Sequence, residues 1–250
     1  MIPVTTTMHI SFAVFAILIV GAFASADCSM DPLRPACMPS VYTCSIAGDA
    51  DVDEGMRACF RDVKSDILLI RFAARQKKPD EHTTVLTFPC GGPRVVMIDG
   101  GSAKATLFNP QFRFSAWCAH NISLHVARMT FLGVEHSIVV PRHVVNFTMS
   151  DCVMSHTDDD SHDIYMRGGE LRLNTIVSSG GGLVAATEMD AVSIKHIRYT
   201  VKSIIKDRSL VRVFMHENNG NIEICDVDIT PVSDFLVEVA NAVFVDTDCD

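Results

Sequence analysis

Apolar residues recur with one spacing in the second half of the chain. After each start position, apolar side chains follow two, four, seven and nine residues later. Two copies match completely: Ile122, Leu124, Val126, Met129 and Phe131, then Val145, Phe147, Met149, Cys152 and Met154. The period-two section predicts a strand with one buried face, and the odd step marks a turn after which inward alternation resumes.

Three further copies are less regular. One has a single polar position: Val192, Ile194, His196, Tyr199 and Val201. Two others start at Leu171 and Ile222 and match for two positions before the pattern degrades. Shorter strand-like runs lie between the copies, at residues 138–140, 164–166, 183–185, 210–214 and 236–239.

The repeat length decides the expected fold. Successive copies start 21 to 30 residues apart, and a unit of this size that buries its apolar face only against its neighbours is typical of a solenoid. Because the units contain short strands and no helical periodicity, we predict an all-β chain folded as a right-handed parallel β-helix. The alternative is a jelly roll or β-sandwich, which also has short strands at regular spacing.

A short helix is predicted before the first strand of the main domain. Met56, Cys59, Phe60 and Val63 recur at helical spacing after the acidic start 51–54, and acidic residues are favourable at a helix N-terminus. The apolar run 67–70 then predicts a buried strand.

The N-terminus has the layout of a secretory signal. An apolar run over residues 10–23 is followed by the small residues Ala24, Ser25 and Ala26, which predicts a signal peptide over 1–26 and a mature chain starting at Asp27. A membrane anchor needs about 20 apolar residues, so we expect no membrane span and a secreted, extracellular protein.

Cysteine usage agrees with secretion. We divide the mature chain into a cysteine-rich segment, 27–50, and a β-helix domain, 51–250. Because no capping helix follows the last predicted strand, we expect the domain to be truncated at its C-terminus. In an oxidising compartment, clustered early cysteines predict disulfides. The candidates are Cys28, Cys37, Cys44, Cys59, Cys90 and Cys118. Asn121 and Asn146 begin N-glycosylation motifs.

The charge balance excludes one class of partner. The chain carries a net charge of −9 and has no basic cluster, so a nucleic acid is not expected to bind.

Residues 50–245 resemble the pectin-lyase-like superfamily of right-handed parallel β-helices. The resemblance rests on the repeats, on the early helix and on Val95–Gly100, which is similar to an early coil of strand followed by Asp-Gly. It implies that the helix caps the open end of the solenoid. The catalytic signatures of the superfamily's polygalacturonases and pectate lyases do not align. Its asparagine ladder is also replaced, at the nearest equivalent positions, by Val126, Met149, Thr175, His196 and Asp226.

Outward positions of stacked strands give the main candidate site. One predicted row contains Ser123, Asn146, Arg172, Ser193 and Glu223, and the other contains His125, Thr148, Asn174, Lys195 and Cys225. Cations beside a carboxylate on one face suit the binding of an acidic sugar and removal of a proton next to its carboxylate. The four catalytic candidates are His125, Arg172, Lys195 and Glu223. The competing interpretation is a solvated face with cross-strand charge pairs.

An acidic segment is a candidate calcium site. Four aspartates, Asp158, Asp159, Asp160 and Asp163, lie between two predicted strands, and carboxylate oxygens are the ligands that Ca²⁺ prefers. The EF-hand pattern is absent, and surface loops are commonly rich in aspartate.

Two functions follow from these patterns. The first is a non-catalytic extracellular solenoid that binds a polysaccharide, a cell-surface glycan or another surface. The alternative is a polysaccharide lyase or glycoside hydrolase acting on an acidic, pectin-like polysaccharide. The absent signatures and the single tryptophan favour the first, since aromatic side chains form the platforms on which sugars stack.

Overall fold

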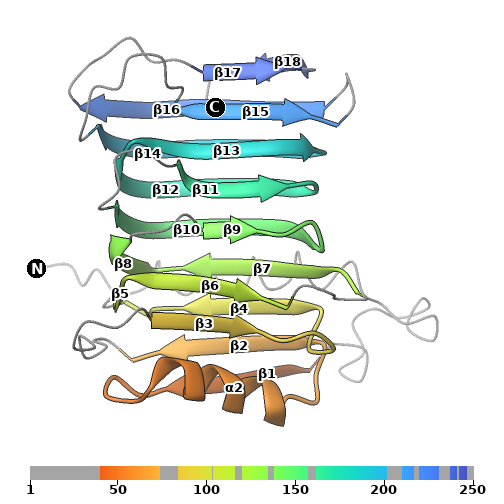
Figure 1. The fold of residues 1–250 in the computed structure, drawn as a ribbon, viewed down its shortest axis with the longest axis vertical. Coiled ribbons are helices and arrows are strands. Elements are labelled where there is room, and N and C mark those ends of the chain that lie inside the picture. The colour runs from red at the N-terminus through yellow and green to blue at the C-terminus, as the bar shows by residue number, and fades with distance from the viewer. Residues whose placement is uncertain are drawn as a thin grey trace, which may run out of the picture.

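The chain folds as a parallel β-helix with one helix at its N-terminal end. The computed structural model describes residues 40–73, 84–102, 104–115, 120–134, 138–156, 162–201, 210–216, 220–230, 237–240 and 242–246. Every strand pair in these ranges is parallel, and the strands stack one above the next from the helix upward (Figure 1). This arrangement confirms the predicted solenoid and excludes the β-sandwich, whose strands would pair antiparallel.

The coils contribute to three sheets. The long sheet has eleven strands: β1 (Val41–Ile46), β2 (Ile67–Phe72), β4 (Val95–Asp99), β5 (Ala105–Phe108), β7 (Ile122–Ala127), β8 (Met129–Val134), β10 (Val144–His156), β12 (Glu170–Gly180), β14 (Ala191–Val201), β16 (Gly220–Thr230) and β18 (Ala242–Asp246). The five-stranded sheet contains β9 (Ile138–Val140), β11 (His162–Arg167), β13 (Gly182–Met189), β15 (Val211–Met215) and β17 (Val237–Ala240). The two-stranded sheet pairs β3 (Thr84–Phe88) with β6 (Pro110–Phe114). Pairing therefore begins at β1, inside the segment 27–50 that the sequence analysis separated from the solenoid.

The long strands turn at one residue with a positive φ angle. This left-handed corner contains one residue from each of five coils: Arg128, Asp151, Thr175, His196 and Asp226, with φ between 52° and 58°. A residue in the left-handed region interrupts the alternation of inward and outward side chains. The step from the last inward position before it to the first inward position after it is therefore odd. The predicted odd step in the apolar pattern is this corner.

The corner also corrects the sequence register of the later copies. Phe147 pairs with Leu171, Leu171 with Val192, and Val192 with Ile222, so these later starts match the second position of the earlier copies. His196 is exposed at the corner and Ile197 takes the inward position that the pattern assigned to His196. Arg128 and Asp151, and not Val126 and Met149, are therefore the residues that align with Thr175, His196 and Asp226.

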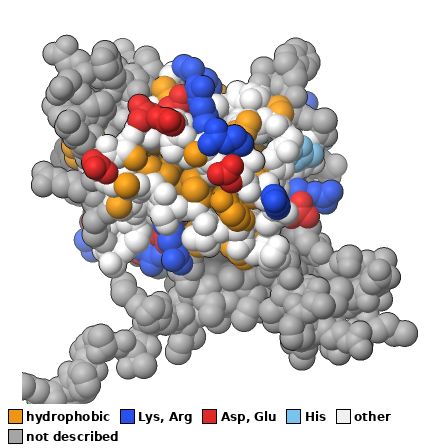
Figure 2. Space-filling model, turned by 90° about the horizontal axis from the view of Figure 1, so that it is seen from below, with side chains coloured by type: hydrophobic (Ala, Val, Ile, Leu, Met, Phe, Trp, Pro, Cys, Tyr) orange, Lys and Arg blue, Asp and Glu red, His pale blue; other side chains and the backbone are white. Residues whose placement is uncertain are grey.

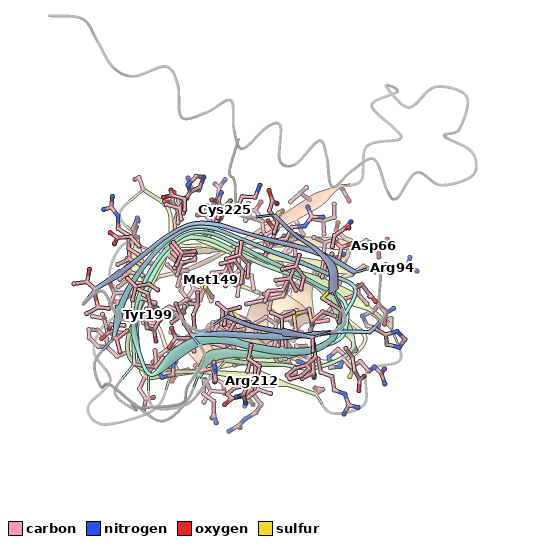
Figure 3. All side chains as sticks on the ribbon, turned by 90° about the horizontal axis from the view of Figure 1, so that it is seen from above. Asp66, Arg94, Met149, Tyr199, Arg212 and Cys225 are labelled. Atoms are coloured by element: carbon pink, nitrogen blue, oxygen red, sulfur yellow. A yellow bond between two sulfur atoms is a disulfide. The ribbon has the colours of Figure 1, made fainter. Side chains whose placement is uncertain are left out.

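Inward side chains form continuous vertical rows through the core. Leu124, Phe147, Leu171, Val192 and Ile222 make one such row and all are buried. Seen along the solenoid axis, Met149 and Tyr199 lie on the inside, whereas Arg212 projects from the five-stranded sheet (Figure 3). Burying each such aliphatic or aromatic side chain contributes about 1.5–3 kcal/mol, so the stacked rows supply most of the cohesion between coils.

Helix α2 (Val52–Asp62) closes the N-terminal end, as predicted. Asp51 caps it by accepting a hydrogen bond from the Glu54 amide at 2.9 Å, and Met56 and Cys59 are its buried residues. A disulfide joins Cys59 to Cys44 of β1. Figure 2 views this end and shows apolar side chains flanked by acidic and basic ones. The helix thus covers apolar surface that an open coil would leave exposed.

Candidate functional site

The outer face of the long sheet carries three polar rows. Strand register places Ser123, Asn146, Glu170, Ala191 and Asn221 in the first row. The second row contains His125, Thr148, Arg172, Ser193 and Glu223. The third row contains Ala127, Ser150, Asn174, Lys195 and Cys225.

Three of the four catalytic candidates therefore share one row. His125, Arg172 and Glu223 lie in the second row, and Lys195 lies in the third, beside Glu223. The predicted rows were wrong at four positions. Ser123 and Asn146 belong to the first row and not to that of Arg172. His125 and Thr148 belong to the row of Arg172 and not to that of Lys195. The physical reason is that the left-handed corner lies closer to the start position in the later copies than in the first two.

Lys195 and Glu223 form an ion pair across successive coils. The Lys195 ammonium contacts the Glu223 carboxylate, and the Ser193 hydroxyl donates to Glu223 Oε2 at 3.1 Å. The hydrogen bond from Lys195, and then that from Ser193, hold the pKa of Glu223 below its usual value despite some desolvation. Glu223 is thus ionised at neutral pH and has no proton to donate to a leaving group.

Arg172 is paired along its own strand. Its Nη2 lies 2.9 Å from Glu170 Oε2, and both side chains are exposed. An exposed pair of this kind contributes at most about 1 kcal/mol, so Arg172 can exchange Glu170 for an anionic ligand at small cost.

His125 is held neutral by its surroundings. Burial, followed by the positive charge of Arg172, lowers the pKa of His125 to about 4. Its Nδ1 is buried and makes no hydrogen bond within the part of the chain that the structure describes. A group with so low a pKa is a weak general base at neutral pH.

Of the four calcium candidates, only Asp163 lies within the described residues. Its side chain is fully buried, where it accepts a hydrogen bond from Ser178 and lies 3.5 Å from His156 Nε2. Asp163 therefore joins an interior polar cluster, while Asp158, Asp159 and Asp160 lie outside the described residues. Across the described ranges, no group of three or more histidine, cysteine or acidic side chains is arranged to hold a metal.

The predicted glycosylation residues differ in accessibility. Asn121 is exposed, whereas Asn146 is half-buried and donates from Nδ2 to Ser123 Oγ at 3.1 Å. Glycosylation would replace one of the two Nδ2 hydrogens of this half-buried amide, so Asn121 is the more open acceptor.

Among the cysteine candidates, the structure joins Cys44 to Cys59. Cys90 is also disulfide-bonded, as is Cys225, which was not among the candidates. Cys28, Cys37 and Cys118 lie outside the described residues. Cys152 is a free, buried thiol, and burial raises its pKa to about 12.

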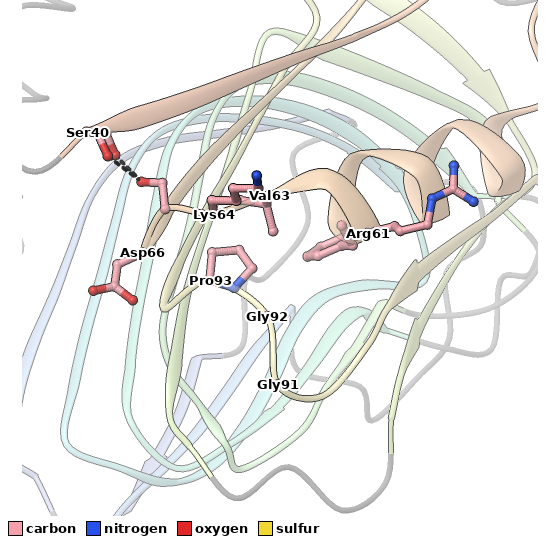
Figure 4. A pocket seen from close by; sticks show the side chains of 10 residues that line it. Ser40, Arg61, Val63, Lys64, Asp66, Gly91, Gly92 and Pro93 are labelled. Carbon is pink, nitrogen blue, oxygen red and sulfur yellow. Dashed lines mark hydrogen bonds between the residues drawn. The ribbon is translucent and has the colours of Figure 1, made fainter.

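A depression opens beside the end of α2. It has a volume of about 560 Å³ and is lined by residues that include Arg61, Lys64, Asp66 and the loop Gly91–Pro93 (Figure 4). Ser65 donates to the Ser40 carbonyl at its rim. Its charges are of both signs.

A second depression lies where the five-stranded sheet passes into the long sheet. It has a volume of about 720 Å³ and is lined by Arg142, Thr187, Glu188, Phe214, Met215 and His216. The sequence analysis missed these residues. They come from segments that are far apart in the sequence. The one local indication of a turn beside this depression was the pair Gly168-Gly169, which precedes the Leu171 copy.

An exposed aromatic side chain was also missed. Tyr165 is 39% exposed on the five-stranded sheet, in one row with Val139, which is 58% exposed, and with Ala185 and Arg212. The composition shows that tyrosines are few, but the strand register is needed to place this one on a flat outer face.

Comparison with known proteins adds no relative. No protein-family model matches the chain, and neither a curated protein nor a solved structure is significantly similar to it. Within the described residues, no helix has the length and apolar composition needed to cross a bilayer.

Proposed function

We propose that the protein is secreted and that it binds an extended glycan along the outer face of the long sheet without cleaving it. The Lys195–Glu223 ion pair is the observation that carries this proposal. In the same proposal, the chain is a pectin-lyase-like β-helix that has kept the architecture and not the chemistry.

The candidate residues are unsuited to acid–base catalysis. A lyase needs a base that is unprotonated and strong enough to remove a carbon-bound proton, and a hydrolase needs a protonated acid. Glu223 is ionised, Lys195 is held as its cationic partner, and the low pKa of His125 makes it a weak base. These states support binding over turnover.

The same rows are well suited to a repeating ligand. Side chains in one row lie about 4.8 Å apart, and the second and third rows offer hydroxyl, amide and charged groups on consecutive coils. Arg172 and Asn174 are exposed on one strand, and Lys195 lies on the next strand. A polymer lying across the coils would exchange weak surface pairs for contacts with its own hydroxyl or carboxylate groups.

The test combines binding with product analysis. Wild-type protein is incubated with soluble polygalacturonate and with a neutral polysaccharide, with and without calcium. Two quantities are measured: the polysaccharide retained by the protein, and the new reducing or unsaturated ends of its chains. We expect retention without new ends, and a loss of retention in Arg172→Ala and in Lys195→Ala. The matched controls are Arg57→Ala and Lys64→Ala, which remove exposed cations at the cap.

Two outcomes would contradict the proposal. New chain ends that disappear in Arg172→Ala would support the polysaccharide lyase or hydrolase. Retention that is equally lost in the cap controls would show charge attraction without a site. Secretion is tested separately by N-terminal sequencing of the exported protein, whose sequence should begin at Asp27.

A further inference from the structure

Four successive coils bring polar side chains to one corner of the solenoid. Arg142 follows β9, Arg167 ends β11, Glu188 lies near the end of β13, and His216 follows β15. The backbone connects these turns: the Gly168 amide donates to the Thr187 carbonyl, and the His216 amide donates to the Met189 carbonyl, each at 2.9 Å. We call the four side chains the arginine corner.

The two arginines do not contact Glu188 in the same way. Arg167 Nη2 donates to Glu188 Oε1 at 2.7 Å, which is a directed hydrogen bond. Arg142 Nη2 lies 2.9 Å from Glu188 Oε2, but that oxygen makes no hydrogen bond of acceptable geometry. Arg167 therefore satisfies the carboxylate, and the N–H groups of Arg142 are less committed to it.

Glu188 is held ionised in a strained backbone position. The hydrogen bond from Arg167 is the main cause that lowers the pKa of Glu188, and the charges of Arg142 and His216 act in the same direction. Its φ angle is 56°, a conformation that is costly for a residue with a side chain.

The chain makes room for Arg142 through a glycine. Gly168 has a φ angle of 79°, and a Cβ atom there would lie 3.3 Å from Arg142 Cγ. Arg142 remains 65% exposed over this glycine. The depression that Arg142 lines also contains Thr187, Phe214, Met215 and His216.

We propose that the arginine corner binds an oxyanion, such as the carboxylate or sulfate group of an acidic sugar. Arg142 is the main donor, because a planar guanidinium presents paired N–H groups that match the two oxygens of such an anion. His216 lines the same depression, and Phe214 offers an apolar surface to a sugar ring. Glu188 competes with the ligand for Arg142, and the hydrogen bond from Arg167 to Glu188 weakens that competition. This site is separate from the glycan-binding face proposed above and needs none of its residues.

Small probes test the site by calorimetric titration at constant ionic strength. The probes are sodium sulfate, monomeric galacturonate and neutral galactose. We expect wild-type protein to bind sulfate and galacturonate but not galactose, and Arg142→Gln to weaken binding about tenfold, the effect of losing one charge-assisted contact. Arg57→Gln is the matched control, since Arg57 is also exposed and paired with a carboxylate.

Glu188→Gln gives the sharper result. It removes the carboxylate that competes for Arg142, so binding of the anionic probes should become tighter, whereas a purely structural role for Glu188 predicts no gain. Unchanged affinity in Arg142→Gln, or weaker binding in a folded Glu188→Gln, would overturn the proposal. Tighter binding of galacturonate than of sulfate would identify an acidic sugar as the ligand, and equal affinities would identify a simple anion. Because the probes are monomers, failure here leaves the polymer-binding assay of Arg172 and Lys195 unaffected.

Discussion

His196 Nδ1 lies 2.6 Å from a carboxylate oxygen of Asp226, on the next coil of the left-handed corner. Both residues have a positive φ angle. Other polar contacts lie along this corner: Arg128 makes two hydrogen bonds to the buried Asp99, and Lys104 lies 3.9 Å from Asp151. Polar side chains therefore link successive coils along this corner.

Thr175 is the least suitable residue type at this corner. Its φ angle is 57°, and branched side chains are rarely found in the left-handed region. We expect Thr175→Asn to stabilise the protein by about 0.5–1 kcal/mol, because asparagine tolerates this conformation better. Urea unfolding would measure the change. Thr43→Asn is the control, since Thr43 is exposed on β1 and has an ordinary strand conformation; an equal gain there would contradict the explanation.

Gly169 is required for a close approach between coils. It has a φ angle of 77°, and a Cβ atom would lie 2.3 Å from the Val145 carbonyl oxygen. We expect Gly169→Ala to destabilise the fold by more than about 2 kcal/mol, the range of clashes that force the backbone to move. Gly101→Ala shares the positive φ angle but meets nothing within 4 Å. It should cost only about 1 kcal/mol, and thermal unfolding of both variants would compare the two.

Acid should weaken the fold through His125. Its pKa is lowered from 6.5 to about 4 by burial and by Arg172, so the unfolded chain takes up a proton at a higher pH than the folded chain. Stability is then lost as the pH falls from about 6.5 to about 4, by an amount on the order of 3 kcal/mol.

The variant His125→Gln tests this pH dependence. Denaturant midpoints measured between pH 7 and pH 4 should fall less steeply in His125→Gln than in wild type. The exposed His196 provides the control variant, His196→Gln. A slope that is unchanged in His125→Gln would assign the acid sensitivity to other groups.

The Cys44–Cys59 disulfide should stabilise the cap. It closes a loop of 15 residues, for which the loss of unfolded-state entropy corresponds to about 3 kcal/mol. We expect the paired substitution of both cysteines by serine to lower the denaturant midpoint accordingly. Cys152, in contrast, should resist a thiol reagent until the protein unfolds, because it is buried and its pKa is raised to about 12. Rapid labelling of Cys152 in the native protein would contradict its placement in the core.

The repeat pattern predicted the fold but not the register of its later coils. Apolar spacing identifies strands because burial imposes alternation, and the copy at Ile122 was placed correctly. In the next copy the start was wrong by one residue, because a bulge makes Val144 and not Val145 the buried partner of Ile122. A single residue in the left-handed region shifts that alternation without any apolar signal, so His196 was predicted inside and Ile197 was not. Which outward side chains pair, such as Lys195 with Glu223, depends on register across coils.

The arginine corner was harder still to predict. Its members come from four coils, and no local spacing relates Arg142 to His216. Asp163 was read as part of a polar loop, because nothing in its neighbourhood shows that the chain enters the core at that residue. Contacts between distant segments decide both cases.

The left-handed corner has a consequence for insertions and deletions. The number of residues between the inward pair and the corner is the same in the coils of Leu171, Val192 and Ile222, although these coils differ in total length. One residue added between Val192 and His196 would reverse the orientation of every side chain up to the corner. The coils can therefore differ in length only in the connections outside the long strands. The position of the corner determines which side chains of each coil point inward onto those of the coil before it.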